Sequence, residues 1–218
     1  MIDDAKLTRE LSTCYTGVVH DVMLGMGLRN FVLPIEITPL IPDAPLCGPA
    51  FTIEGHPAEG TDGHETLLAW TGLLSKAPAG HVWISQPHTH DLAQMGELSA
   101  ETLKNKGVLG CVVDGLARDT EFLRKIGFQT WRRGHTPKDV VGRWLPTDTG
   151  HTIHIGGVAI AQGDYLLGDS DGMVRIPRAN VVEVTEKSII AMQTESKVRT
   201  EILNGTDPQE AYLKYGKF

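Results

Sequence analysis

Cysteine is scarce in this 218-residue chain, which contains only Cys14, Cys47 and Cys111. The three residues are far apart and stand in apolar contexts, so the pattern excludes a disulfide framework and a cysteine-rich zinc cluster. We expect three buried free thiols in a reducing compartment, and the cytoplasm is therefore the expected location.

Basic runs and long apolar runs are also missing. The chain has 20 Lys and Arg against 27 Asp and Glu, a net charge of −7, which gives no basic surface for nucleic acid. No apolar stretch is long enough to span a membrane, and residues 1–10 lack a signal-peptide pattern. No G-x-G-x-x-G turn follows a strand pattern, which argues against a dinucleotide or methyl-donor site. We expect neither a nucleic-acid nor a membrane partner.

Hydrophobic periodicity predicts a mixture of helices and strands in one core. Helices are expected at residues 3–11, 15–26 (capped by Ser12-Thr13), 65–75, 100–106, 120–125, 181–203 and 208–215. Strands are expected at residues 31–40, 46–53, 81–85, 108–113, 127–131 and 152–161, with a hairpin over 163–177 and an irregular, basic segment over 132–148.

The stretch from Gly96 to Asp119 holds the densest group of candidate functional residues. A glycine-led loop, Gly96 to Ser99, precedes the predicted helix at 100–106. The strand at 108–113 then ends at the turn signal Asp114-Gly115. Arg118 and Asp119 follow this turn directly.

If the two ends of this helix–strand unit lie close together, they form a site for a small anion and a hard metal ion. Backbone N–H groups of residues 96–99 and the guanidinium of Arg118 suit a carboxylate. The carboxylate of Asp119 suits Mg²⁺, which takes few protein ligands. The alternative is an exposed Arg118–Asp119 ion pair beside a turn, which is common on protein surfaces and contributes little to stability.

Four histidines form a second candidate group. His88 and His90 are spaced like a metal-binding pair, but the spacing marks no third ligand, and solvated loop histidines are the alternative. His56 and His64 lie in a Gly-, His- and acid-rich segment and favour a peripheral role.

The central stretch resembles the signature of a known family. Gly96-Glu97, Gly107, Gly110, Val112, Asp114-Gly115, Arg118-Asp119 and Gly127-Phe128 fit the pattern of the class II pyruvate aldolases. That family includes the 4-hydroxy-4-methyl-2-oxoglutarate and 4-carboxy-4-hydroxy-2-oxoadipate aldolases and the regulator of ribonuclease activity A. The resemblance covers roughly residues 12–172 and includes the hairpin over 163–177.

The resemblance implies an α/β fold of the swivelling β/β/α type, a layered and antiparallel-rich sandwich flanked by helices. It implies a core domain over residues 1–180 and a C-terminal helical extension over 181–218 that packs on a neighbouring subunit. A homotrimer or a homohexamer is the expected assembly.

The implied function is a divalent-metal-dependent lyase, an aldolase or oxaloacetate decarboxylase. It would cleave a 4-hydroxy-2-oxo acid and release pyruvate through a metal-stabilised enolate. The resemblance implies Asp119 as the ligand of Mg²⁺ or Mn²⁺. It assigns substrate binding to Gly96, Leu98, Ser99 and Arg118, and catalysis to Arg118, Glu97 and Glu195, the last acting in the neighbouring subunit's site with Glu201 as its alternative.

Two other functions remain open on the same residues. One is a non-catalytic regulator that binds another protein, as the ribonuclease regulator does. The other is a related lyase or hydratase acting on a sugar acid, with substrate contacts from residues 55–64 and 132–143. The physiological substrate and the second product are not predicted by the sequence.

Overall fold

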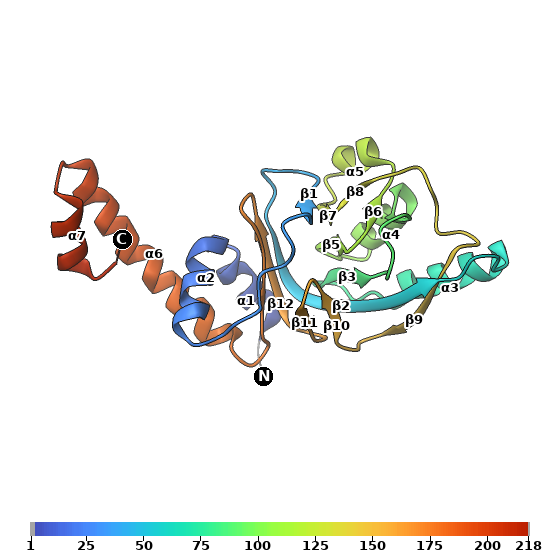
Figure 1. The fold of residues 1–218 in the computed structure, drawn as a ribbon, viewed down its shortest axis with the longest axis horizontal. Helices are drawn as coiled ribbons and strands as arrows, with labels where there is room; N and C mark the ends of the chain where they lie inside the picture. The colour runs from blue at the N-terminus through green and yellow to red at the C-terminus, as the bar shows by residue number, and fades with distance from the viewer. Residues whose placement is uncertain (1–2, 218) are drawn as a thin grey trace.

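The computed structural model describes residues 3–217, and Figure 1 shows a sheet-containing body with a helical arm on one side. The helices are α1 (Asp4–Leu11), α2 (Thr16–Gly25), α3 (Gly63–Lys76), α4 (Glu97–Asn105), α5 (Thr120–Ile126), α6 (Val181–Leu203) and α7 (Pro208–Tyr215). The strands are β1 (Thr38–Pro39), β2 (Leu46–Pro57), β3 (Val82–Gln86), β4 (Ala93–Met95), β5 (Gly110–Val113), β6 (Leu116–Ala117), β7 (Thr130–Arg132), β8 (Gly134–His135), β9 (Trp144–Thr149), β10 (Ile153–Ile155), β11 (Val158–Ile160), β12 (Tyr165–Asp169) and β13 (Gly172–Ile176).

The main sheet is mixed, with strand order β1-β7-β5-β3-β2-β12-β13 and β9 added to β2. Its centre is parallel, because β2 pairs with β3, β3 with β5, and β5 with β7 in the same direction. Helices α3, α4 and α5 stand between these strands in sequence, as parallel crossovers require. The expected α/β fold is confirmed, and four of the seven strand pairs in the main sheet are antiparallel, in line with the expected antiparallel-rich sheet.

The segment 31–40 was expected to be a strand pattern broken by Pro34 and Pro39, and the structure divides it between two edges of the sheet. Its beginning pairs with β13, where the N–H of Leu33 donates to the carbonyl of Met173 at 2.9 Å. Its end is β1, which pairs with β7 at the opposite edge of the sheet. Pro34 and Pro39 lack the N–H groups that a continuous strand needs, so the segment bends from one edge to the other and largely closes the sheet.

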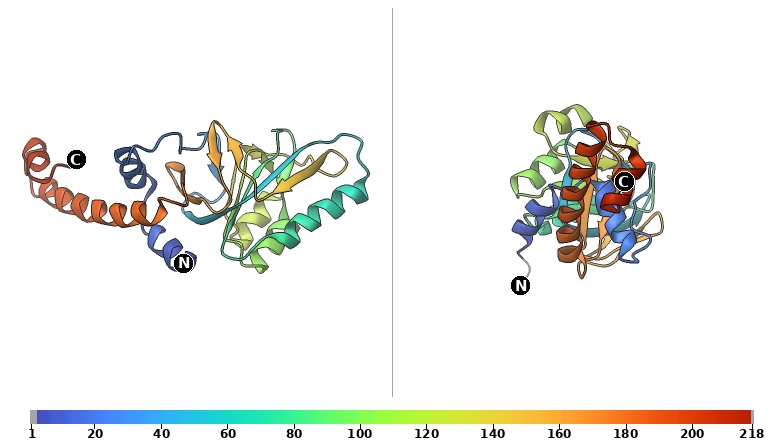
Figure 2. Two further views of the ribbon diagram at one scale, coloured as in Figure 1. Left: turned by 90° about the horizontal axis from the view of Figure 1, so that it is seen from below. Right: turned by 90° about the vertical axis from the view of Figure 1, so that its left-hand side faces the viewer.

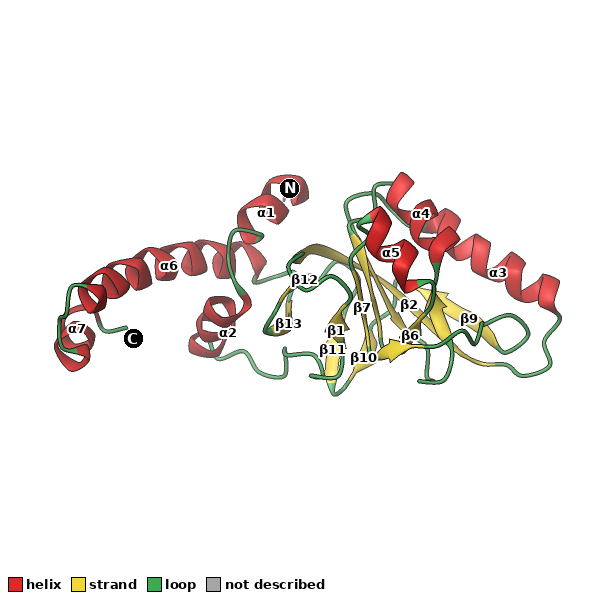
Figure 3. Ribbon diagram, turned by 90° about the horizontal axis from the view of Figure 1, so that it is seen from above, coloured by secondary structure: helices red, strands yellow, loops and turns green. Residues whose placement is uncertain are grey.

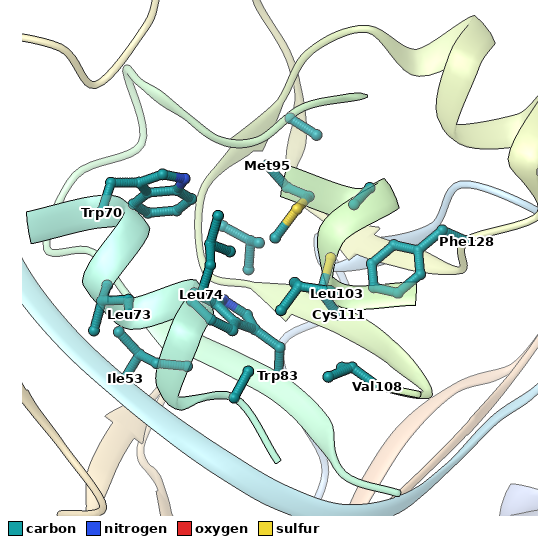
Figure 4. Close-up of a cluster of buried hydrophobic side chains, with 14 of the residues drawn as sticks. Ile53, Trp70, Leu73, Leu74, Trp83, Met95, Leu103, Val108, Cys111 and Phe128 are labelled. Carbon is teal, nitrogen blue, oxygen red and sulfur yellow. The ribbon is translucent and has the colours of Figure 1, made fainter. Parts of the chain in front are cut away.

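Three clusters of buried side chains form the core. Figure 4 shows the cluster between the sheet and α3 and α4, in which Trp70, Trp83 and Met95 lie beside Leu74 and Leu103. A second cluster packs the opposite face of the sheet against the β10–β11 hairpin. The third joins α1, α2 and the first half of α6 to β12 and β13. Figure 3 shows α3, α4 and α5 together on one side of the sheet.

The three cysteines are confirmed as buried free thiols. Burial raises the pKa of Cys111 to about 12 despite its contact with the Thr130 hydroxyl. Burial likewise raises the pKa of Cys47 to about 12, with a smaller contribution from nearby Cys14. Thiols in this state are weak nucleophiles, so the cysteines have a packing role.

Helix α6 leaves the body as an arm, with α7 folded back at its far end (Figure 2). Exposed apolar side chains follow this arm: Ile190, Leu203, Tyr212 and Leu213. Among residues 3–217, no helix combines the length and apolar character needed to cross a membrane.

Several boundaries differ from the sequence prediction. Helix α2 begins at Thr16, one residue after the expected start, but Ser12-Thr13 does not cap it. Its N-cap is Tyr15, and Asp169 of the distant hairpin accepts hydrogen bonds from both the N–H and the hydroxyl of Thr16, each at 2.7 Å. The expected strand at 152–161 is a hairpin turning at Gly156-Gly157, and the expected irregular segment 132–148 contains β8 and most of β9.

Candidate active site

A small parallel sheet, β4-β6-β8, brings the candidate residues together. Met95 of β4 pairs with Ala117 of β6, so Gly96 and Arg118 emerge side by side at the carboxyl ends of the two strands. Side chains and loops at such ends converge on ligands in many α/β proteins. The sequence analysis did not predict these strands, because strands of two or three residues are too short to show an alternating pattern.

The two ends of the Gly96–Asp119 stretch meet as expected. The backbone N–H of Glu97 donates to Asp119 Oδ2 at 3.1 Å, and Arg118 Nε lies 3.5 Å from the same oxygen. Asp119 has left-handed backbone angles, φ 54° and ψ 37°, which aspartate tolerates better than most residues. This conformation places Asp119 at the N-cap of α5, beside the first turn of α4.

Gly96 is the residue that permits this approach. A Cβ atom at position 96 would lie 2.7 Å from Asp119 Oδ2 and 3.0 Å from Arg118 Nε. Any other residue would therefore displace the carboxylate or the guanidinium. The glycine is required by its neighbours and not by its φ angle of −143°, which other residues adopt freely.

Residues 96–99 differ from the expected loop, because α4 begins at Glu97 and Gly96 is its N-cap. The N–H groups of Leu98 and Ser99 therefore belong to the first helical turn, where they have no carbonyl partner within the helix. Such a turn attracts carboxylates and phosphates. Ser99 is held in place by Trp70, whose indole N–H donates to its hydroxyl at 2.9 Å.

These residues line a pocket of about 440 Å³. Its polar members include Gly96, Glu97, Ser99, Arg118 and Asp119, and its apolar wall is formed by Leu67, Trp70, Leu74, Leu98, Val140 and Val141. The volume suits a small organic acid.

Two pocket residues were not predicted from the sequence. Asp139 Oδ2 pairs with Arg118 Nη1 at 2.9 Å, so the guanidinium is held between Asp119 and Asp139. Asp139 stands in the segment that was expected to be irregular, and a bridge to Ala93 of β4 fixes its place. No sequence motif marks Asp139, because its contact with Arg118 depends on how the strands of the β4-β6-β8 sheet pair.

The other unpredicted residue is Gln94 of β4. Its side chain is buried, and neither atom of its amide has a hydrogen-bond partner among residues 3–217. Buried amides without partners are costly, so this one is a candidate for contact with a ligand in the pocket it lines.

The donor set of the pocket fits a hard divalent cation. Three carboxylates, from Glu97, Asp119 and Asp139, face one guanidinium, so the site has an excess of negative charge. Oxygen ligands suit Mg²⁺ and Mn²⁺, and Mg²⁺ is commonly held by one or two carboxylates with water completing the shell. Among residues 3–217, the three carboxylates do not converge closely enough to share one ion in this arrangement.

The structure does not bring Glu195 to this pocket within the chain. Glu195 lies on α6, on the opposite side of the body from α4 (Figure 1). It accepts a hydrogen bond from Tyr15 and pairs with Lys217 at 3.2 Å. Burial lowers the pKa of Lys217, but its bonds to Glu195 and Asp21 outweigh this and raise the pKa above the ordinary value. The alternative acid, Glu201, is bound to Lys214, Thr206 and Tyr215.

The contacts of the four histidines do not follow their spacing in the sequence. His90 lies 3.5 Å from Asp114, whereas His88 contacts Glu54 and His56. His64 is exposed in the first turn of α3 and does not line the pocket. His88 and His90 therefore do not form a metal-binding pair with each other, and both are exposed loop residues, as the alternative interpretation held.

Comparison with solved structures supports the fold. A crystal structure of an uncharacterized protein from Pseudomonas syringae pv. tomato matches with a TM-score of 0.88 at 23% identity, covering 99% of this chain and 96% of the other. Streptomyces coelicolor RraAS2, described with its crystal structure as an unusual member of the RNase ES inhibitor RraA protein family, matches with a TM-score of 0.79 at 25% identity, over 91% of this chain and 98% of the other.

Sequence relatives point the same way. Protein DlpA of Legionella pneumophila is 27% identical over 96% of this chain, which spans only 34% of the length of DlpA. A Halalkalibacterium halodurans protein named "Putative 4-hydroxy-4-methyl-2-oxoglutarate aldolase" is 29% identical over 74% of this chain and 73% of its own length. The profile of the RraA-like family, described as Aldolase/RraA, matches residues 16–175. With Gly96, Arg118 and Asp119 inside the matched region, the chain belongs to the RraA-like aldolase family.

Proposed function

We propose that the protein is a divalent-metal-dependent lyase that cleaves a 4-hydroxy-2-oxo acid and releases pyruvate. The observation that carries the proposal is the meeting of Arg118 and Asp119 with the first turn of α4 in one pocket. It joins an anion-binding turn, a fixed cation and a metal-binding carboxylate. These three groups would together bind the carboxylate and keto oxygens of a 2-oxo acid.

Each residue has a distinct role in this proposal. The N–H groups of Leu98 and Ser99 bind the substrate carboxylate, and Gly96 leaves room for it beside the helix. Arg118 donates to the keto oxygen, and Asp139 holds the guanidinium in that direction. Asp119 would hold Mg²⁺ or Mn²⁺, which would supply Lewis-acid stabilisation of charge on the keto oxygen.

Carbon–carbon cleavage requires that a proton leave the 4-hydroxyl. As the C3–C4 bond breaks, its electron pair moves into the 2-keto group, an aldehyde or ketone leaves, and the resulting pyruvate enolate takes up a proton at C3. Glu97 is the pocket carboxylate assigned to this proton transfer, because it forms no ion pair among residues 3–217. Oxaloacetate would lose CO₂ through the same enolate.

Glu195 lies away from the pocket of its own chain and contacts Tyr15 and Lys217. If this acid serves the pocket, it must come from a neighbouring chain, and the exposed apolar residues of α6 and α7 offer a surface for such a contact. We therefore propose that the arm packs on a neighbour in a homotrimer or a homohexamer. A mixture of Asp119→Ala and Glu195→Gln subunits should then recover activity that both variants lack alone, because mixed assemblies contain some intact sites.

Pyruvate release, coupled to lactate dehydrogenase, tests the proposal directly. The substrates are oxaloacetate and 4-hydroxy-4-methyl-2-oxoglutarate, each with Mg²⁺, with Mn²⁺ and with EDTA. We expect metal-dependent turnover that Asp119→Ala abolishes and Glu121→Ala, an acid on the same helix outside the pocket, retains. Absence of turnover of both substrates in folded, metal-loaded protein would contradict it.

A non-catalytic regulator is the second candidate function. It is favoured by the likeness to RraAS2, whose family is described by inhibition of an RNase. A related lyase or hydratase acting on a sugar acid would use the same polar groups, with other residues contacting the rest of the substrate. Turnover of oxaloacetate without turnover of the oxoglutarate substrate would favour this second lyase over the regulator.

A further inference from the structure

A second cluster of metal-ligating side chains lies outside the candidate active site. It consists of Glu54, His56 and His88, whose ligand atoms all lie within 4.8 Å of one another. None of the three lines the pocket that contains Arg118 and Asp119. The cluster is therefore separate from the site proposed for lyase chemistry.

The strand β2 presents two of the three ligands. Glu54 and His56 are two residues apart, so their side chains point to the same face of the strand. The extra residue of the adjacent bulge belongs to β9, since Glu54 opposes Asp148 and Gly55 opposes Pro146. The alternation along β2 is therefore undisturbed, and the two side chains are fixed by a strand in the interior of the sheet.

The third ligand comes from the loop after β3, and its backbone is unusual. His88 has a φ angle of 52°, one of few positive values at non-glycine residues in the described chain. Such a conformation is unfavourable and persists only where the surroundings impose it, often at ligand-binding positions. The preceding carbonyl, that of Pro87, accepts a hydrogen bond at 3.0 Å from the indole N–H of buried Trp144. This contact anchors the loop.

The ligand atoms of the three side chains lie close together, with the two imidazole rings stacked on each other. The rings of His56 and His88 are stacked 4.1 Å apart with an angle of 8° between their planes, and His88 Nε2 lies 2.8 Å from Glu54 Oε1. Two ligands of a tetrahedral Zn²⁺ ion stand about 3.4 Å apart at bond lengths near 2.1 Å. Because an imidazole nitrogen binds a metal in the plane of its ring, at least one of the two stacked rings must turn about its side-chain bonds before both nitrogens and the Glu54 oxygen can share one ion.

We propose that Glu54, His56 and His88 form a binding site for Zn²⁺. Two imidazole nitrogens and one carboxylate oxygen are a donor set that suits Zn²⁺ better than Mg²⁺ or Ca²⁺, which prefer oxygen ligands alone. Three protein ligands leave a fourth position for water. The bound ion ties the end of β2 to the loop that leads into β4, the strand carrying Gln94.

Metal binding is measured on the full chain after removal of metal with EDTA and dialysis. The Asp119→Asn variant serves as the background, so that ions held in the pocket do not contribute. Zn²⁺ content is determined by equilibrium dialysis and elemental analysis, and Co²⁺ is used as a visible probe, since tetrahedral Co²⁺ gives strong absorption bands. We expect one ion per chain in this background.

The variants His56→Ala, His88→Ala and Glu54→Gln should each weaken this binding, by at least about 100-fold for the histidines. The matched control is His90→Ala, two residues along the same loop, which should retain the ion because His90 contacts Asp114 instead. At free Zn²⁺ about 100-fold above Kd, the Tm should rise by roughly 5–10 °C, and this rise should disappear in His88→Ala.

Three results would overturn the proposal. The first is no stoichiometric Zn²⁺ or Co²⁺ binding in the Asp119→Asn background. The second is binding that His88→Ala leaves unchanged. The third is equal loss in His90→Ala and His88→Ala, which would show non-specific association with exposed histidines.

Discussion

The backbone N–H of Glu97 donates to Asp119 Oδ2 at 3.1 Å, although 22 residues separate the two in the chain. This bond joins the N-termini of α4 and α5, which bear partial positive charge and favour a carboxylate between them. The arrangement fixes Asp119 at the pocket before any ligand binds. Several measurable consequences follow from this geometry and from the buried groups around it.

Gly96→Ala should abolish the proposed pyruvate release without unfolding the protein. The new Cβ would meet the ends of the Asp119 and Arg118 side chains, which can move, and not the backbone. We expect pyruvate release to fall by about 100-fold or more, because the catalytic groups are displaced. The free energy of unfolding should change by less than about 1 kcal/mol in urea titrations. Gly72→Ala, at a helical glycine with open space, is the control and should retain activity.

Asp139→Asn should reduce turnover by about 10- to 100-fold, because the misdirected Arg118 guanidinium binds the keto oxygen less well. The loss should be in kcat more than in KM if Arg118 acts mainly on the developing charge. Steady-state kinetics with oxaloacetate measure both constants. Lys138→Ala, at the neighbouring exposed position, is the comparison. An unchanged kcat in Asp139→Asn would remove Asp139 from the mechanism.

Gln94→Leu should stabilise the protein and weaken substrate binding. The free energy of unfolding should rise by about 1–3 kcal/mol, because the variant removes a buried amide that has no partner among residues 3–217. Urea unfolding and KM measure the two effects. Gln129→Leu is the control, for which the free energy of unfolding should fall. The buried amide of Gln129 bonds to the backbone of Ile41 and Ala44, so its loss should destabilise the fold. Destabilisation by Gln94→Leu would contradict the prediction.

The native thiols should be nearly unreactive at pH 8. With a pKa of about 12, Cys47 and Cys111 are thiolates to only about one part in 10⁴, and burial also blocks access. Ellman's reagent should therefore react slowly with the folded protein. In urea, which unfolds the chain, it should react with all three cysteines. Ser75→Cys, at an exposed helical position, should add one fast-reacting thiol. Fast reaction of wild type would contradict the packing role of the cysteines.

Acid stability should depend on Asp4. Burial raises the pKa of Asp4, but bonds from Arg178 and Tyr165 more than offset this, so the pKa lies below its ordinary value. The stabilisation is therefore complete above the unfolded pKa, near 3.9, and is lost as the pH falls through the lower folded pKa. Urea unfolding between pH 6 and pH 3 should show a shallower acid loss for Asp4→Asn than for wild type. Asp3→Asn, which keeps the N-cap of α1, should behave like wild type.

Local sequence patterns determined much of what was predicted correctly. The long helix α6 was predicted with its observed ends, because a 23-residue run ends at Asn204-Gly205, and these signals act within a few residues. The buried thiols were predicted by apolar context. The sequence placed Gly96 and Arg118-Asp119 in one site only on the condition that the two ends lie close, supported by the family resemblance, and the bond from Glu97 to Asp119 meets that condition.

Other features were decided by contacts between distant parts of the chain. Asp139 and Gln94 enter the pocket through the short strands β4, β6 and β8, whose pairing energy comes from neighbours and leaves no periodic pattern. His88 joins Glu54 and His56 rather than His90, because β2 and β3 are parallel neighbours in the sheet. The sequence by itself determined the local elements and the glycine–arginine–aspartate chemistry. Only the tertiary structure decided which side chains surround them, since that depends on the register of strands far apart in the chain.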